Sequence, residues 1–253
     1  MSHEPDGASF ERVTDIGTTS PTLIEGLPGL GMVASIAVDQ ITSQLDLEYH
    51  GNIRADAFPP VAAFSDGRVR DAVRVYAGED PSVMTLRSDI PIPPNAVEPL
   101  SRCVHQDLAD EFDRAVFLAG APAESAEQIG EVRGVATTDA IEDDLREADI
   151  TLAEESGAIG GITGGLVSDC YHNDVPAAVL IVRCDPRLPD PGAARSVIED
   201  ALEPLVDFDI DTTELEEQAE KIQQRKQQVI QQLQQMQQGE GEGETAQSRA
   251  MYQ

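Results

Sequence analysis

The chain has 253 residues, of which 47 are acidic and 17 basic, and its formal net charge at pH 7 is -30. This excess of negative charge repels nucleic acid and anionic membranes, so neither is an expected partner. The chain has no apolar leader and no run near the roughly twenty apolar residues that span a membrane, which predicts a soluble, cytoplasmic protein.

The positive charge comes almost entirely from arginine, because Lys221 and Lys226 are the only lysines. An acidic chain in which arginine replaces lysine is similar to the cytosolic proteins of extreme halophiles, whose carboxylates stay hydrated in concentrated salt. On this interpretation the charge is an adaptation to the solvent and says little about function.

Three cysteines, Cys103, Cys170 and Cys184, fit a reducing cytosol better than a disulfide framework. Cys170, His172 and Cys184 are conceivable metal ligands, but their spacing matches no structural zinc pattern. Small buried thiols are the favoured interpretation, and neither a metal nor a cofactor is expected.

Taken in order, the chain opens with residues 1–20, which offer few side chains that could pack in a core. This segment is predicted to be a disordered N-terminus.

A strand at 22–25 then runs into GLPGLG, residues 26–31, and into a helix over 32–45. A nucleotide site is one alternative here, because a helix N-terminus behind glycines can cradle an anion. The spacing G-x-x-G-x-G matches neither the dinucleotide fingerprint nor the P-loop, so a close turn that needs small residues is favoured.

Strands and helices alternate over the rest of the first two hundred residues. Strands are expected at 47–54, 61–64, 68–76, 82–88, 115–119, 134–137 and 177–182, and helices at 96–112, 139–148, 166–172 and 189–206. The runs AVFLA and AAVLIV are wholly apolar, which is typical of strands buried on both faces of a parallel sheet. A second glycine stretch, residues 157–165, precedes the helix at 166. The predicted fold is therefore α/β, a three-layer αβα domain over residues 21–208 with a mixed, largely parallel central sheet.

The end of the chain predicts a helix followed by a flexible tether. Apolar residues within 212–238 alternate in steps of four and three, as in a heptad repeat, and Lys226 fills the missing place. The residues of this stripe are Leu215, Ala219, Ile222, Val229, Leu233 and Met236. The stripe could join copies into an oligomer or pack on its own domain. Residues 239–253 contain too many glycines to hold a helix and form the tether.

The chain ends in Met251, Tyr252 and Gln253, which place an apolar residue and a tyrosine beside a free carboxylate. This ending has the chemistry of a peptide ligand, because backbone N–H groups or a lysine can capture the carboxylate while the tyrosine fills a pocket. The alternative is that three terminal residues carry no function. The helix and the tether before them favour a ligand.

The order of these features resembles the proteasome-assembly-chaperone family, in its archaeal, haloarchaeal branch. The resemblance rests on GLPGLG between a strand and a helix, on FPP before a hairpin, and on GAIGGITGGL before a helix, and it spans about residues 20–206. It implies a fold like that of purine nucleoside phosphorylases without their activity. It also implies an ATP-independent, homo-oligomeric chaperone whose Met251, Tyr252 and Gln253 dock into pockets between α subunits of the proteasome core particle.

Two other functions remain as alternatives. A nucleoside phosphorylase or hydrolase would bind phosphate or ribose at the glycine stretches and use carboxylates or His172 as acid and base. The sequence holds no G-x-S-x-G motif, no H-E-x-x-H motif and no convincing triad, so a protein without enzymatic activity is favoured. A generic oligomeric scaffold is the third possibility, and it would not depend on the last three residues.

Overall fold

The computed structural model describes residues 7–228 and residue 231, and it divides the chain into two compact units, Met1–Thr212 and Thr213–Gln253. The first unit holds the α/β domain. In the second unit, residues 213–228 form a helix. Within the described residues, no helix is both long and apolar enough to cross a membrane.

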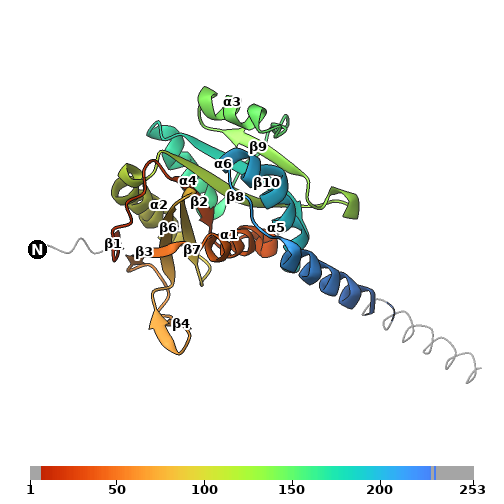
Figure 1. Cartoon of the computed structure of the whole chain (residues 1–253), viewed down its shortest axis with the longest axis horizontal. Coiled ribbons are helices and arrows are strands. Elements are labelled where there is room, and N and C mark those ends of the chain that lie inside the picture. The colour runs from red at the N-terminus through yellow and green to blue at the C-terminus, as the bar shows by residue number, and fades with distance from the viewer. Residues whose placement is uncertain (1–6, 229–230, 232–253) are drawn as a thin grey trace, which may run out of the picture. The chain divides into compact units, whose positions relative to one another are not determined.

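An eight-stranded sheet forms the centre of the first unit, in the order β1-β3-β6-β7-β2-β8-β10-β9 (Figure 1). Its strands are β1 (Ala8–Arg12), β2 (Thr22–Gly26), β3 (Glu48–Ala55), β6 (Val73–Glu79), β7 (Ser82–Ser88), β8 (Arg114–Pro122), β9 (Val132–Ala136) and β10 (Ala177–Cys184). The pairs that join β7, β2, β8 and β10 are parallel, and the other neighbouring pairs are antiparallel.

The sheet is mixed, as predicted, but the expectation that it is largely parallel is wrong outside its centre. The connection from β6 to β7 shows why. Only Asp80 and Pro81 separate Glu79 from its partner Ser82, and so short a loop can join only antiparallel strands. The direction of a strand therefore depends on its connections, which the apolar pattern of each strand does not reveal.

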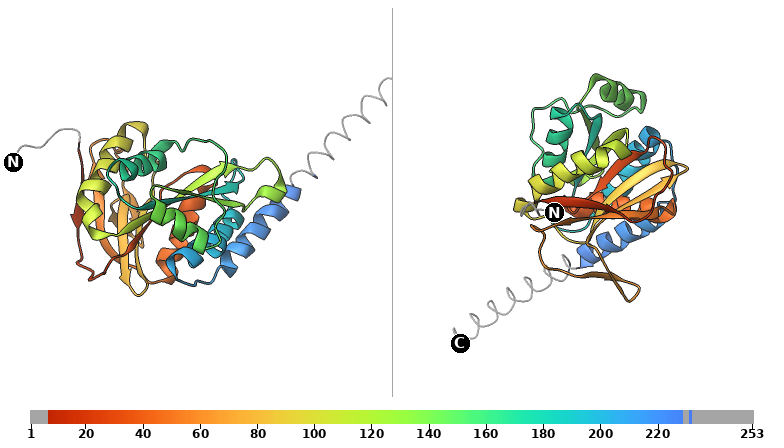
Figure 2. Two further views of the ribbon diagram at one scale, coloured as in Figure 1. Left: turned by 90° about the horizontal axis from the view of Figure 1, so that it is seen from above. Right: turned by 90° about the vertical axis from the view of Figure 1, so that its left-hand side faces the viewer.

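Helices cover both faces of the sheet (Figure 2). On one face α1 (Val33–Gln44) packs against α5 (Pro191–Val197), and on the other α2 (Val97–Cys103) packs against α4 (Gly161–His172). The remaining α-helices are α3 (Asp139–Glu147), which contacts β9 and β10, and α6 (Glu203–Val206). Short 3-10 and π turns complete the domain as η1 (Leu30–Met32), η2 (Pro94–Ala96), η3 (Val104–Leu108), η4 (Ala109–Glu111), η5 (Ala126–Gln128) and η6 (Ile198–Leu202).

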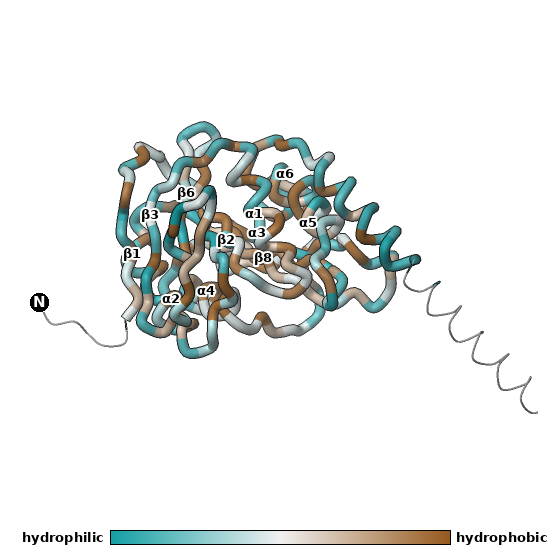
Figure 3. The backbone as a smooth tube through the Cα atoms, turned by 90° about the horizontal axis from the view of Figure 1, so that it is seen from below, coloured by the Kyte–Doolittle hydropathy of each residue, from teal (hydrophilic) through white to brown (hydrophobic). Residues whose placement is uncertain are grey.

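The central strands bury side chains on both faces, as their apolar runs predict. Leu23 and Phe117 belong to a buried cluster that includes Leu100 of α2 and Leu166 of α4. Successive side chains of a strand point to opposite faces. The alternate residues therefore point to the face that α1 and α5 cover, and they too are buried: Ile24, Val116, Leu118, Ala178 and Leu180. Figure 3 shows the apolar character of β2 and β8 between the two layers of helices.

The N-terminal residues differ from the sequence prediction. β1 pairs antiparallel with β3, and the ring of Phe10 stacks on His50 with 5.7 Å between centroids. Arg12 and His50 both bind the carboxylate of Glu111, which ties β1 to two distant segments. The prediction of a disordered N-terminus is therefore wrong for residues 8–12. Phe10 alone gives too little apolar pattern to predict a strand from the sequence, and the strand forms because β3 is available to pair with it.

Several predicted elements have different bounds in the structure, and two of them differ in a way that matters for the site. The strand expected at 68–76 is divided into β5 (Arg68–Arg70) and β6, and β5 pairs with β4 (Ala63–Ser65) in a separate two-stranded hairpin. α4 begins at Gly161 and not at 166, because the helix includes the second half of the glycine stretch. Thr138 caps α3, since its Oγ1 accepts a hydrogen bond from the N–H of Ile141 at 3.3 Å.

The helix over 213–228 contains the first residues of the predicted stripe. Leu215 is buried, and Ala219, Ile222 and Lys226 are less exposed than the residues between them. Val229, Leu233 and Met236 lie outside the described residues. The part of the stripe in oligomerisation therefore stays a prediction.

Candidate functional site

The predicted docking residues Met251, Tyr252 and Gln253 lie outside the described residues, so their role stays a prediction. Within the described residues, the sequence singled out two glycine stretches, 26–31 and 157–165. A residue that the sequence did not single out, Glu25, connects them at the carboxyl end of β2.

Glu25 is a buried carboxyl group, and it is 0 % exposed. Its Oε1 accepts a hydrogen bond from the N–H of Leu27 at 2.8 Å, and its Oε2 accepts one from Oγ1 of Thr163 at 3.4 Å. Burial raises the pKa of Glu25 to about 7, although hydrogen bonds from Leu27, Leu118 and Thr163 oppose that rise. The carboxyl group therefore links the first glycine stretch, β8 and the second glycine stretch.

A pKa near neutrality is common among catalytic acids and bases. The side chain of Glu25 is closed off from solvent, however, and its hydrogen bonds go to groups of the fold itself. Its position is that of a structural link. Sequence reasoning missed it because acidic residues are abundant in this chain, although a glutamate inside the apolar strand TLIEG is an unusual signal.

Close packing accounts for some of the glycines. A Cβ at Gly26 would lie 2.4 Å from Cβ of Val38, because α1 crosses directly over β2. A Cβ at Gly164 would lie 2.2 Å from the carbonyl oxygen of Ile159. A Cβ at Gly29 would meet only the carbonyl oxygen of Leu27, at an ordinary contact distance of 4.0 Å. The interpretation as a close turn that needs small residues is therefore confirmed at Gly26 and wrong at Gly29.

Loops that follow three parallel strands enclose a pocket of about 730 Å³, which we call the switch-point pocket. Its walls come from residues 28–32 and the start of α1, from the loop after β7 and from residues 186–189 after β10. β2 and β7 are adjacent and parallel, but β2 continues to α1 on one face while β7 continues to α2 on the other. Such a reversal is the topological switch point at which open α/β sheets bind their ligands.

Both carboxylates that line the switch-point pocket are paired with arginines. Asp39 binds Arg87, and Asp89 binds Arg70 at 3.2 Å and also Arg74. Burial raises the pKa of Asp39 above its usual value. Burial acts in the same direction on Asp89, but the hydrogen bond and charge of Arg74 outweigh it and hold the pKa of Asp89 below its usual value.

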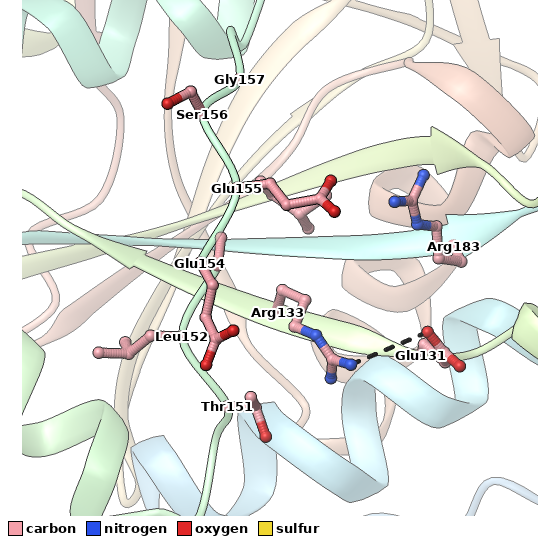
Figure 4. Close-up of a pocket in the computed structure, with 11 residues that line it drawn as sticks. Glu131, Arg133, Thr151, Leu152, Glu154, Glu155, Ser156, Gly157 and Arg183 are labelled. Carbon is pink, nitrogen blue, oxygen red and sulfur yellow. Dashed lines mark ion pairs between the residues drawn. The ribbon is translucent and has the colours of Figure 1, made fainter.

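A second pocket, of about 490 Å³, lies beside β9 and β10 (Figure 4). Charged side chains of both signs line it: Glu131, Arg133, Glu154, Glu155 and Arg183. Glu131 and Arg133 form an ion pair at 4.0 Å, in which each side chain is 46 % exposed. This mixture of charges indicates no single class of ligand.

The hairpin β4–β5 projects from the sheet (Figure 1), and it carries exposed apolar side chains. Phe64 and Val69 are opposite each other across the two strands, and they are 76 % and 77 % exposed. Side chains of directly opposite residues lie on the same face. Exposed apolar surfaces often contact other proteins. The sequence predicted a hairpin after FPP but did not identify its apolar face.

The three cysteines are free and buried, as predicted. Burial raises the pKa of each thiol, to about 12 for Cys170 and about 11 for Cys184. Within residues 7–228, no group of three or more His, Cys, Asp and Glu side chains is placed to hold a metal ion.

Comparisons with known proteins bear on this architecture. The sequence model of the PAC2 family matches residues 23–230. The uncharacterized protein MJ0106 of Methanocaldococcus jannaschii is 28% identical over 228 residues, which are 90% of this chain and 92% of that protein.

Two solved structures from Pyrococcus furiosus have a similar fold. PbaA, an archaeal homolog of proteasome-assembly chaperone, matches with a TM-score of 0.78 and 22% identity, over 97% of this chain and 100% of PbaA. PbaB, an archaeal proteasome activator, matches with a TM-score of 0.79 and 17% identity, over 88% of this chain and 99% of PbaB.

Proposed function

The chain belongs to the PAC2 family, and from this premise we propose that it is a proteasome-binding factor that acts as an ATP-independent assembly chaperone. The proposal rests on the fold and on the terminal residues taken together. The fold is similar to those of PbaA, a homolog of proteasome-assembly chaperone, and of PbaB, a proteasome activator. The sequence ends in Met251, Tyr252 and Gln253, which have the chemistry of a docking peptide.

In the proposed mechanism the terminal residues dock into pockets between neighbouring α subunits of the core particle. The ring of Tyr252 fills a groove, and the terminal carboxylate of Gln253 pairs with a basic residue of the α ring. One tail makes few contacts, and ordering it costs conformational entropy, so a single tail binds weakly. A flexible chain of about the length of residues 239–253 spans roughly 20 Å root-mean-square, which would let a tail find a pocket without strict alignment.

Self-association would supply the missing affinity. Several tails on one homo-oligomer convert the later contacts into intramolecular ones and raise avidity by orders of magnitude. We propose that the stripe that begins at Leu215 contributes to this oligomer, with Lys226 weakening it at a core position. Light scattering in concentrated salt should give a mass well above the 27.2 kDa of the monomer. A monomer across the micromolar range would remove the avidity argument.

The decisive experiment compares binding of terminal variants to purified core particle by surface plasmon resonance at matched molar salt. Deletion of residues 251–253 and Tyr252→Ala should each weaken binding more than tenfold. Tyr252→Phe keeps the ring and should lose only the hydrogen bond of the hydroxyl group, about 0.5–1.5 kcal/mol. Circular dichroism and light scattering on the same samples should be unchanged. If the deletion variant binds as well as the wild type, the terminal residues are not the docking element.

The enzyme alternative makes a different prediction for the same protein. A nucleoside phosphorylase or hydrolase should give a micromolar signal in calorimetric titrations with nucleosides, nucleotides or phosphate. The proposed function predicts flat titrations with all three. The terminal variants also test the scaffold alternative. A scaffold that recruits another protein through its helix should bind that protein equally well with and without residues 251–253.

A further inference from the structure

Large exposed apolar side chains gather in two places on the α/β domain. Across the described residues there are seven of them, and three belong to the hairpin β4–β5 and the loop that leads into it: Val61, Phe64 and Val69. Two more, Met32 and Leu188, line the switch-point pocket. Clustered exposed apolar side chains mark contact sites, so the hairpin and the pocket are candidates for the two sides of one interface.

The apolar face of the hairpin points away from the domain that carries it. Ala63 is buried, and its partner across the two strands, Arg70, binds Asp89 at 3.2 Å. Successive side chains of a strand alternate between the two faces. Phe64 and Val69 therefore lie on the face opposite Ala63 and Arg70, and both stay exposed. The partner of this apolar face is therefore a surface other than the core of its own domain.

The switch-point pocket has the lining that an aromatic side chain needs. Its volume is about 730 Å³, and prolines extend the apolar wall that Met32 and Leu188 form: Pro28, Pro91, Pro186 and Pro189. Pockets that bury an apolar group are concave and mostly apolar. Side chains that anchor protein interfaces are commonly aromatic, and they fill such pockets. The pocket therefore suits an anchor such as the ring of Phe64.

The hairpin and the pocket adjoin each other on the domain. Asp89 lines the pocket and binds Arg70 of β5, so the base of the hairpin lies next to the pocket wall. When two complementary features adjoin, a two-fold axis can bring the hairpin of each copy to the pocket of the other. Both contacts then form at once, and the pair is closed, with neither a hairpin nor a pocket left over.

Charge also favours a second copy of this chain as the partner. The formal net charge is -30, so two copies repel each other over most of their surface. Residues 61–70 are an exception, because they contain two arginines and one aspartate. Two aspartates and one arginine line the pocket: Asp39, Asp89 and Arg187. The charges of hairpin and pocket are opposite in sign, which makes this approach favourable for two acidic chains.

We propose that two copies of this chain pair through this surface, with the ring of Phe64 of each copy in the switch-point pocket of the other. Val61 and Val69 add apolar contact around the ring. The inference rests on the self-association that the proposed function includes, and it supplies a surface for it. It depends neither on residues 251–253 nor on the stripe that begins at Leu215.

Sedimentation velocity over a concentration series of the full chain, at fixed molar salt, measures the pairing. The wild type should have at least twice the 27.2 kDa of the monomer, and Phe64→Ser should raise the dissociation constant at least tenfold. Tyr171→Ser is the matched control and should leave it unchanged, because Tyr171 is an aromatic side chain that is 63 % exposed on α4, on the face of the sheet opposite α1. Thermal melting shows that both variants stay folded. A monomeric wild type, or an unchanged dissociation constant in Phe64→Ser, would overturn the proposal.

Crosslinking between two different variants shows which surface receives the hairpin. Chains with Val69→Cys, which keep Phe64, are mixed with chains that carry Leu188→Cys and are treated with a short bis-maleimide. The three native cysteines are buried, so the added thiols should react first. The mixture should give a covalent dimer, whereas a mixture of Tyr171→Cys with Leu188→Cys should not. Linking no stronger than in that control would show that the pocket is not the receiving surface.

Binding to the core particle separates this inference from the proposed function. Deletion of residues 251–253 should leave the pairing intact while it weakens binding to the core particle. If pairing depends on Phe64 but the wild type does not bind the core particle, the proposed function fails and the pairing surface stands. If Phe64→Ser keeps the mass of the wild type but loses binding to the core particle, the hairpin contacts the proteasome and the proposed pairing is wrong.

Discussion

The two glycine stretches resemble each other in sequence, yet they meet their surroundings in different ways. Gly26 lies between two buried elements, because Val38 of α1 rests directly on β2. Gly164 lies beneath the backbone of Ile159, in a segment whose residues 154–158 are exposed. Ile159 is half-buried, but the residues that precede it are exposed, so we expect this segment to yield to an added methyl group more easily than the buried helix α1 does. The importance of a glycine therefore depends on what approaches it and not on the motif that contains it.

Gly26→Ala should have the largest effect on stability. The added Cβ would force α1 away from β2, and we expect a loss near the upper end of the range for overpacked cores, about 3 kcal/mol. Denaturant unfolding measures the change, with Gly29→Ala as the matched control because its added Cβ makes only an ordinary contact. Equal losses in the two variants would mean that the turn as a whole, and not the contact with Val38, requires glycine.

Glu25→Gln should change the pH dependence of stability. The folded state holds a proton on Glu25 up to about pH 7, whereas the ordinary pKa is 4.5. The unfolded state therefore releases this proton first, and the free energy of unfolding falls as pH rises from about 4.5 to 7 and is then constant. Between pH 5 and pH 8 this contribution is about 2 kcal/mol.

Glu25→Gln lacks the ionisable group. Its free energy of unfolding should therefore lack the part of the fall between about pH 4.5 and 7 that Glu25 causes. The measurement is the difference between wild-type and variant unfolding free energies at each pH, in which the other carboxylates cancel. A difference that does not change with pH would show that Glu25 does not titrate in this range, and that it does not link the two stretches as a protonated group.

Gly164→Ala should cost less than Gly26→Ala, about 1 kcal/mol, because the exposed segment around Ile159 can shift. Gly160→Ala is the control within the same stretch, since nothing lies near its added Cβ. Thermal unfolding of both variants measures the difference. A loss as large as that of Gly26→Ala would contradict the contrast between a buried and an exposed neighbour.

Thr163→Val should have the smallest effect. Its hydroxyl group donates one long hydrogen bond to Glu25, at 3.4 Å, so we expect a loss of about 0.5 kcal/mol at pH 8. Removing this donor should raise the pKa of Glu25 further, because the bond favours the ionised form. The pH at which stability levels off should therefore move upward. No movement would show that the hydrogen bond from Thr163 does not affect the ionisation of Glu25.

The sequence by itself determined the features that are local. Wholly apolar runs predicted strands buried on both faces, and the segment of strand, glycine turn and helix over 22–45 predicted β2 and α1. Each of these depends on residues a few positions apart, whose side-chain pattern and backbone preferences are written in one segment.

Only the tertiary structure decided the features that need distant partners. β1 forms because β3 offers an edge, the outer strands are antiparallel because of how their connections run, and Glu25 becomes a link because Thr163 arrives from another helix. The switch-point pocket needs loops from three strands and a helix start. Burial, register and pKa are properties of the assembled neighbours, so no single segment of the sequence contains them.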